Sequence, residues 1–271
     1  MLKQRVITAL VLLPIALGGF FLLDGALFAL FIAAVVCLGG WEWARLAGLA
    51  AQPLRVAYAG VVAVLLYGLY QLPALASSVL LLGVAWWAVA TVWVLNYPAS
   101  SRYWDGTPGR LLIGLLILLP AWQGLVLLKQ WPLANGLILA VMVLVWGADI
   151  GAYFAGKTFG KRKLAPRVSP GKSWEGLAGG LLASLLIAAA VGLYRGWSGA
   201  ELLLALAGAA LVVLVSVVGD LTESMFKRQA GVKDSSHLLP GHGGVLDRID
   251  SLTAAIPLFA VLLWLAGWGA L

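Results

Sequence analysis

The sequence predicts an all-α integral membrane protein, a polytopic helical bundle of about nine transmembrane helices. Hydrophobic residues make up 62% of its 271 residues and charged residues only 11%, whereas soluble domains carry about 25% charged residues. Long runs such as residues 111–128 and 202–218 contain no charge, and runs of this length match the thickness of a bilayer. The runs are continuously apolar and do not alternate, which argues against an outer-membrane barrel.

Nine apolar spans can be drawn along the chain, each with the length that a helix needs to cross the hydrocarbon core. The first follows two basic residues and resembles a signal peptide, but no A-x-A-like site precedes the next apolar run, so we expect it to stay uncleaved. Small residues within the spans allow the helices to approach closely. The spans are residues 6–23, 26–44, 56–72, 76–95, 110–128, 133–151, 176–194, 202–220 and 252–270.

The distribution of basic residues predicts the orientation of the bundle. With nine spans, 16 of the 18 Lys and Arg residues fall on one side, and only Lys129 and Arg195 fall on the other. Because cytoplasmic loops collect Lys and Arg, the N-terminus is expected in the cytoplasm and the C-terminus outside, in the inner membrane if the protein is bacterial. The net charge of +7 therefore reflects membrane orientation, and no nucleic-acid-binding module is recognisable.

Four acidic residues lie where predicted spans meet the cytoplasm. Asp149 lies near the end of the sixth span, Asp220 ends the eighth, and Asp247 and Asp250 come just before the ninth. Ionisable residues near the hydrocarbon boundary are costly and usually functional. Carboxylates that face each other across two helix ends suit Mg²⁺, which binds through one or two carboxylates together with substrate phosphates.

Spacing predicts which polar side chains share a helix face. If the eighth helix continues past Asp220, then Asp220, Glu223, Ser224 and Lys227 lie on one face. Asp247 and Asp250, three residues apart, share a face in the same way. A positive lining suited to phosphates would come from Lys172, Lys227, Arg228, Lys233 and Arg248.

Two glycine-containing segments suggest contacts with an anionic ligand. SPGKSWEG, residues 169–176, leads into the seventh span and places serine, lysine and backbone N–H groups near a helix N-terminus, which favours anions. PGHGG, residues 240–244, predicts a turn whose glycines let the backbone approach a ligand. His242 in this turn either binds phosphate or structures the loop. The two histidines, without a nearby cysteine, are a weak set of zinc ligands.

Simpler interpretations fit several other polar residues. The bases between Lys157 and Lys163 are expected to anchor the chain to the anionic leaflet. Glu42 and Arg45 are expected to form an i, i+3 pair at the membrane interface. His237 is expected to be a solvated loop residue. For Asp220 and Asp247, the alternative to metal binding is helix capping or salt bridges with Arg228 and Arg248.

The segment SMFKRQAGVKDSSHLLPGHGGVLDRID, residues 224–250, resembles the defining motif of phosphatidate cytidylyltransferases, also called CDP-diacylglycerol synthases. GDLTES, SPGKSWEG and DIGAYFAG also resemble segments of that family, although Gly171 stands where many relatives carry a lysine. Residues 1–130 resemble the family only in hydropathy, so the active site is expected in residues 131–271. The matching positions are Ser224, Lys227, Arg228, Lys233, Asp234, His242, Gly243, Gly244, Asp247, Arg248 and Asp250.

The resemblance implies an enzyme of phospholipid biosynthesis that makes CDP-diacylglycerol and pyrophosphate from CTP and phosphatidate, with Mg²⁺, at the cytoplasmic face. It implies that Asp220 and Asp247 bind the metal, and it leaves a second cation and a homodimer open. Membrane lipid is an expected partner and nucleic acid is not. The catalytic residues that it implies are Lys227, Arg228, Lys233, Asp234, His242, Arg248 and Asp250. The substrate-binding residues that it implies are Asp149, Ser169, Lys172, Ser173, Ser224, Gly243 and Gly244.

Two other classes of membrane protein fit the sequence less well than the enzyme. A cation-coupled transporter would place ionisable residues near the bilayer midplane, on paired broken helices. The predicted spans carry essentially no charge at that depth, and the acids gather at one face. A membrane scaffold with a structural basic loop would not require four carboxylates beside its bases. The sequence therefore favours the enzyme.

Overall fold

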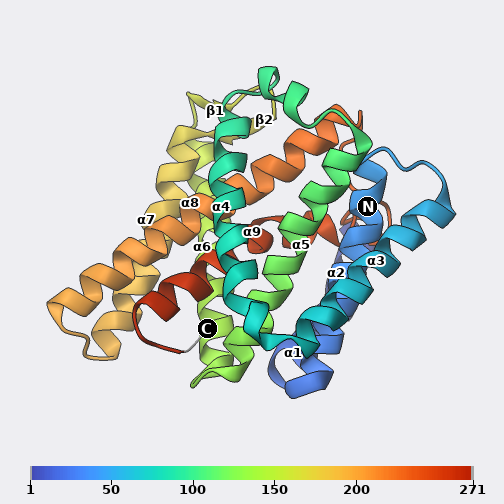
Figure 1. Cartoon of the computed structure of the whole chain (residues 1–271). Helices are drawn as coiled ribbons and strands as arrows, with labels where there is room; N and C mark the ends of the chain where they lie inside the picture. The colour runs from blue at the N-terminus through green and yellow to red at the C-terminus, as the bar shows by residue number, and fades with distance from the viewer. Residues whose placement is uncertain (1, 270–271) are drawn as a thin grey trace.

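The computed structural model describes residues 2–269 and confirms a bundle of α-helices (Figure 1). Eight helices in this part of the chain are long and apolar enough to cross a membrane, and α1 contributes a shorter apolar segment, Val6–Phe21. The helices occupy the nine predicted regions. They are α1 (Leu2–Phe21), α2 (Gly25–Leu46), α3 (Gln52–Gln71), α4 (Ala76–Leu95), α5 (Thr107–Gln130), α6 (Ala134–Phe159), α7 (Trp174–Tyr194), α8 (Gly199–Gln229) and α9 (Leu246–Leu265), with short 3-10 turns at Pro73–Leu75 and Ala99–Tyr103.

Three helices extend six residues or more beyond the apolar spans that the sequence predicts for them. α6 continues to Phe159, α8 continues to Gln229, and α9 begins at Leu246. Apolar sequence marks only the part of a helix that lies in hydrocarbon, and the polar continuation of α8 is rich in good helix formers such as Glu, Met, Lys and Arg. Asp149 and Asp220 therefore lie inside helices, about two to three turns before the helix ends.

α8 is 31 residues long and has a specific cap at each end. At its start, Ser198 and Glu201 form a reciprocal capping box. At its end, Gly231 adopts a φ of +70°, which glycine reaches without steric cost. The N–H of Val232 then donates to the carbonyl of Lys227 at 3.0 Å, which closes the last turn. These caps fix where α8 begins and where its polar end stops.

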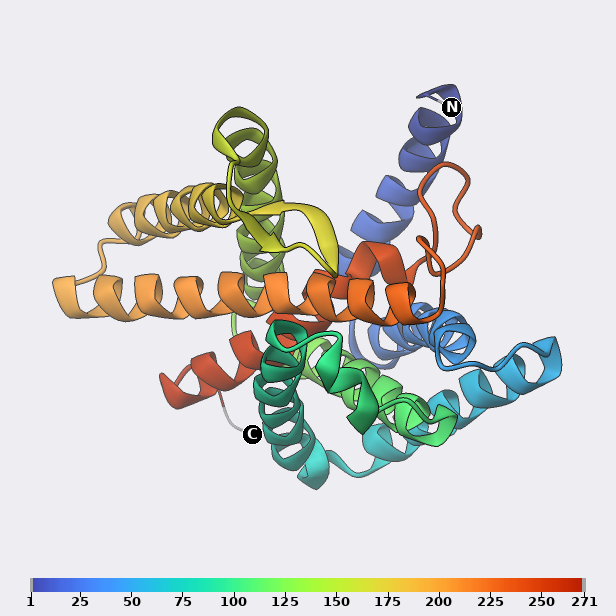
Figure 2. The same cartoon turned by 90° about the horizontal axis from the view of Figure 1, so that it is seen from above.

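α5 and α9 form the centre of the bundle. In the apolar segment of α5, 72% of the residues are buried, against 17% in α3. α6 and α7 pack closely because Gly151 has no side chain. A Cβ at this position would lie only 2.7 Å from the carbonyl oxygen of Gly179. Seen from above, α8 crosses much of the molecule beside α6 and α7, and its second half meets the start of α9 (Figure 2).

Contacts at the two ends of the bundle agree with the predicted alternation of the spans. At one end, the Lys129 ammonium on α5 contacts the carbonyl of Phe20 at 2.9 Å and the side chain of Asn135 at 2.6 Å. At the other end, the Thr8 hydroxyl on α1 donates to the carbonyl of Pro240 at 2.9 Å. The start of α1 and the glycine turn after α8 therefore lie on the same side.

A β-hairpin joins α6 to α7 where the sequence suggested only a basic loop. Its strands are β1 (Lys163–Ala165) and β2 (Ser169–Ser173), paired antiparallel. β2 leads directly into α7, whose first turn is capped by the Ser173 hydroxyl accepting from the N–H of Gly176 at 3.1 Å. The Arg228 guanidinium on α8 donates to the carbonyl of Val168 at 3.1 Å. The hairpin is thus held against the polar end of α8.

Candidate active site

A cavity of about 210 Å³ lies between α6, α7, α8 and the hairpin. Its polar lining combines side chains that the sequence assigns separately to substrate and metal binding, namely Asp149, Lys172, Ser173 and Asp220. The rest of its lining is mainly apolar and includes Leu177, Val213 and Val217. Ser169, also predicted to bind substrate, begins β2 opposite Ala165 and is not among the residues that line the cavity.

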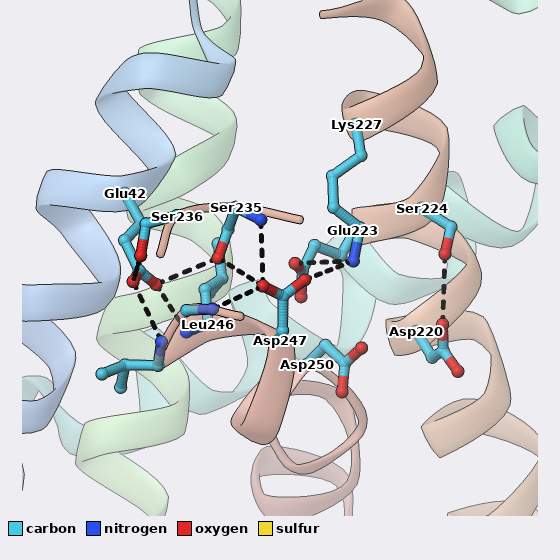
Figure 3. A network of polar contacts seen from close by, with 12 residues as sticks. Glu42, Asp220, Glu223, Ser224, Lys227, Ser235, Ser236, Leu246, Asp247 and Asp250 are labelled. Atoms are coloured by element: carbon cyan, nitrogen blue, oxygen red, sulfur yellow. Dashed lines mark hydrogen bonds and ion pairs between the residues drawn. The ribbon is translucent and has the colours of Figure 1, made fainter. Parts of the chain in front are cut away.

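An ion pair in the polar lining of the cavity joins the hairpin to α8. The Lys172 ammonium lies 2.6 Å from Asp220 Oδ2, and both side chains are about one quarter exposed. The Ser224 hydroxyl donates to Asp220 Oδ1 at 3.2 Å (Figure 3), as the predicted helix face requires. Asp149 is close enough for its charge to interact with Lys172 and Asp220. Asp220 thus pairs with Lys172, and not with the arginines that the alternative interpretation had considered.

A second, buried cluster lies between α8 and α9. The Lys227 ammonium contacts Asp247 Oδ1 at 2.6 Å and Glu223 Oε1 at 3.1 Å. The side chains are 11% exposed for Lys227, 6% for Asp247 and 4% for Glu223. One lysine therefore neutralises part of the charge of two buried carboxylates. Figure 3 places Asp250 between Asp247 and Asp220, so that the two clusters adjoin.

Asp247 also organises the segment that precedes it. Its Oδ2 accepts hydrogen bonds from the N–H of Ser235 at 2.9 Å, the hydroxyl of Ser235 at 2.8 Å and the N–H of Gly244 at 2.8 Å. Gly243 adopts a φ of +81°, and a Cβ there would lie 2.7 Å from Asp247 Oδ2. The glycines were predicted to admit a ligand to the backbone, but in the structure they admit carboxylates of the protein itself.

Glu42 on α2 is a component of this network that sequence reasoning missed. The interfacial pair predicted for Glu42 and Arg45 is wrong, because Glu42 is fully buried and accepts hydrogen bonds from the segment before α9 (Figure 3). Its partners lie 193 to 204 residues away in the chain, so local spacing carries no sign of them. The one available signal was a lone acid in an apolar helix, which is costly unless it has partners.

The other predicted site residues differ in their exposure to solvent and in whether they contact other side chains. Exposed Lys233, Asp234 and Arg248 make no hydrogen bond or ion pair to any other described side chain, so their charges are available to a ligand. His242 is half-buried, and its Nδ1 has no partner among the described residues. His237 is exposed, as predicted. The structure thus contains a buried network and, beside it, charged groups that face solvent.

Comparison with known proteins identifies the family. The sequence matches the cytidylyltransferase family over residues 3–266. It is 79% identical over 270 residues to the phosphatidate cytidylyltransferase of Pseudomonas aeruginosa, and the alignment covers 100% of both chains. The chain belongs to the cytidylyltransferase family. The resemblance found in the segment after Asp220 is therefore confirmed.

More distant members of the cytidylyltransferase family are also similar. The phosphatidate cytidylyltransferase of Haemophilus influenzae is 43% identical over 287 residues, covering 96% of this chain and 98% of the relative. The phosphatidate cytidylyltransferase of Brucella suis is 49% identical over 134 residues, covering 48% of this chain and 46% of the relative. The first of these shows that the similarity includes the N-terminal helices as well as the polar segments.

The carboxylates of this cytidylyltransferase provide hard oxygen ligands without forming a complete metal cage. Among the described residues, no three acidic, His or Cys side chains are placed to hold an ion by themselves. Glu223 has the Lys227 ammonium at 3.1 Å, but neither of its buried oxygens accepts a hydrogen bond from a described residue. Three carboxylates, those of Asp220, Glu223 and Asp247, lie within 3.1 Å of only two ammonium groups, those of Lys172 and Lys227, and Asp149 and Asp250 lie near Asp220. Hard oxygens of this kind fit Mg²⁺, which takes its remaining ligands from water and phosphates.

Proposed function

We propose that this protein transfers CMP from CTP to phosphatidate, giving CDP-diacylglycerol and pyrophosphate. The observation that carries the proposal is the cluster of paired lysines and carboxylates at the polar ends of α8 and α9, beside a cavity whose remaining lining is mainly apolar. Such a site suits a substrate with a phosphate head group and acyl chains. The names of the full-length relatives support the same reaction.

In the proposed reaction, an oxygen of the phosphatidate phosphate attacks the α-phosphorus of CTP. A new P–O bond forms as the bond between the α-phosphate and the departing pyrophosphate breaks. The second pKa of a phosphate monoester is near 6, so the attacking group is largely dianionic at neutral pH and needs no strong general base. The main obstacle is repulsion between two polyanions, which cationic groups of the protein must reduce.

The cationic side chains that would act on the phosphates come from the cavity lining and from the exposed residues beside the buried network. Lys172 lies on the cavity wall, and Lys233 and Arg248 are exposed and without protein partners among the described residues. Arginine can hold phosphate oxygens in a bidentate arrangement. Asp220 and Asp247 would hold Mg²⁺, and the chemistry supplied by the bound ion is neutralisation of phosphate charge and stabilisation of the leaving group.

The proposed activity is tested with the purified protein in detergent and labelled CTP. We expect CMP transfer and pyrophosphate release only when phosphatidate is present, because its phosphate supplies the nucleophile. Diacylglycerol, which lacks that phosphate, is the matched control and should give no product. Equal turnover with diacylglycerol would refute the mechanism, and no transfer to phosphatidate would refute the function.

We further propose that the N-terminus and the site lie in the cytoplasm, the C-terminus lies outside, and the membrane is the inner membrane of a bacterium. The uneven distribution of Lys and Arg supports this orientation. A reporter fused at the C-terminus should report an external position, and one inserted in residues 156–172 a cytoplasmic position. Finding both on one side would contradict the proposed topology. The homodimer stays a prediction.

A further inference from the structure

Glu42 joins α2 to the polar segment that follows α8. Its Oε1 accepts from the hydroxyl of Ser236 at 2.6 Å and the N–H of Val245 at 2.9 Å. Its Oε2 accepts from the N–H of Leu246 at 2.6 Å and the hydroxyl of Ser235 at 3.2 Å. A carboxylate has about four acceptor sites, and donors from the protein face all of those of Glu42, although the single hydrogen of the Ser235 hydroxyl is shared with Asp247.

Two of these donors are backbone groups at the start of α9. The first N–H groups of a helix have no partner within the helix, and Val245 at the N-cap of α9 provides no side-chain cap. Glu42 provides the missing acceptor from a different helix, and a negative charge is favourable at a helix N-terminus. The position of α9 therefore depends on a carboxylate of α2.

Glu42 is also connected to Asp247 through Ser235. The Ser235 hydroxyl lies 3.2 Å from Glu42 Oε2 and 2.8 Å from Asp247 Oδ2. Gly244 cannot carry a side chain here, because a Cβ would collide with the Glu42 carboxylate and the Ser235 hydroxyl. Two routes thus lead from Glu42 to Asp247, one through Ser235 and one through the first turn of α9.

We propose that Glu42 is a positioning residue for CMP transfer, which holds Asp247 and the start of α9 in the arrangement that the reaction requires. The inference rests on the proposed function, because positioning is measured by turnover. Glu42 is buried beneath the polar segment, so it acts through Ser235, Leu246 and Asp247 and does not contact the substrates. It also extends the functional part of the chain into the N-terminal helices.

The substitution Glu42→Gln tests this role at nearly constant size. One end of the new amide is an NH₂ group, which cannot accept from the N–H of Val245 or Leu246. We expect kcat per folded molecule to fall about 10- to 100-fold, since a displacement near 1 Å is enough for such a loss. KM for CTP and phosphatidate should change less than about 3-fold, because the groups that face the substrates remain.

A second measurement needs no substrate and separates this inference from the proposed function. Amide hydrogen exchange in residues 235–247 should accelerate by about 10-fold or more in Glu42→Gln, while exchange in α5 stays unchanged. Glu201→Gln is the matched control, since it removes the exposed carboxylate that caps the start of α8. The control should leave both turnover and exchange in residues 235–247 as in the wild type.

Ser235→Ala provides an independent test if Glu42→Gln folds poorly, because it removes only the bridging hydroxyl. We expect a loss of about 3- to 10-fold in kcat, and the double variant should lose less than the product of the single losses, as linked residues do. Losses that simply multiply, or a normal kcat per folded molecule in Glu42→Gln, would overturn the positioning role. A wild type that transfers no CMP would refute the proposed function and the positioning role together, whereas unchanged exchange would refute the Glu42 cap alone.

Discussion

Replacing Asp220 with asparagine should lower CMP transfer by about 10²- to 10⁴-fold while the protein stays folded. Asparagine keeps the size of the side chain but lacks the negative charge that pairs with Lys172 at 2.6 Å and that a hard cation needs. The Asp220 side chain is 29% exposed. Water can therefore form the hydrogen bonds that Lys172 and Ser224 lose in the variant. Turnover and thermal unfolding of the purified variant are to be measured together.

A magnesium titration distinguishes a metal ligand from a residue that only orients a neighbour. If Asp220 binds the ion, raising Mg²⁺ should restore part of the activity of Asp220→Asn, because weaker binding is offset by mass action. His237→Ala, in the exposed part of the same polar region, is the control and should be nearly silent. Near-normal turnover of Asp220→Asn at limiting Mg²⁺ would contradict the assignment and direct the search to Asp149 or Asp250.

Asp247→Asn should affect both activity and stability. The sequence places Asp247 just before an apolar span. A carboxylate at a helix end that packs against no core could be replaced without affecting folding. In the structure it accepts hydrogen bonds from Ser235 and Gly244 and pairs with Lys227. An amide nitrogen would face one of these donors, and a buried donor without an acceptor costs about 1–3 kcal/mol. Asp220→Asn is therefore the cleaner test of metal binding.

Replacing Lys227 with methionine should destabilise the protein by about 3–5 kcal/mol, because it leaves buried carboxylates without their counter-charge. Glu223 is affected most, since the Lys227 ammonium is its ionic partner and no hydrogen bond from a described residue replaces it. For a chain of this size, the loss corresponds to a fall in Tm of roughly 6–20 °C. Thermal unfolding in detergent measures it, and CMP transfer should fall as well because Asp247 loses its partner.

The double variant Lys227→Met with Glu223→Gln shows whether charge is the cause. Removing one of the two stranded carboxylates should recover part of the lost Tm, whereas activity should stay low because Asp247 remains without its lysine. Lys157→Met, at an exposed position on α6, is the matched control and should unfold like the wild type. A Lys227→Met protein that is as stable as this control would show that the buried ion pairs contribute little.

The class of fold could be predicted from hydropathy and charge because the bilayer imposes both patterns on the sequence. The limits of the helices could not, since apolarity ends at the headgroups while hydrogen bonding continues the helices to Phe159 and Gln229. The pairing of Lys172 with Asp220 and of Lys227 with Asp247 required the three-dimensional arrangement. The sequence gathered these residues into one region but did not determine which base meets which acid.

Glu42 shows most clearly what the sequence could not supply. Its hydrogen-bond partners are two serines and two backbone N–H groups, none of which is distinctive in a sequence, and they lie 193 to 204 residues away. The expectation of an active site confined to residues 131–271 followed from motifs alone. A motif records side chains at fixed spacing along the chain, whereas the cap of α9 is a contact between distant helices.

The length of α8 has a consequence for how the gene can change. At 1.5 Å per residue its 31 residues extend about 46 Å, so a helix that spans about 30 Å of hydrocarbon continues beyond it without interruption. Inserting or deleting one residue in the apolar part would turn the face that carries Asp220 and Lys227 by about 100° and move it by about 1.5 Å. Natural variation in this stretch should therefore exchange one apolar side chain for another while the number of residues stays constant.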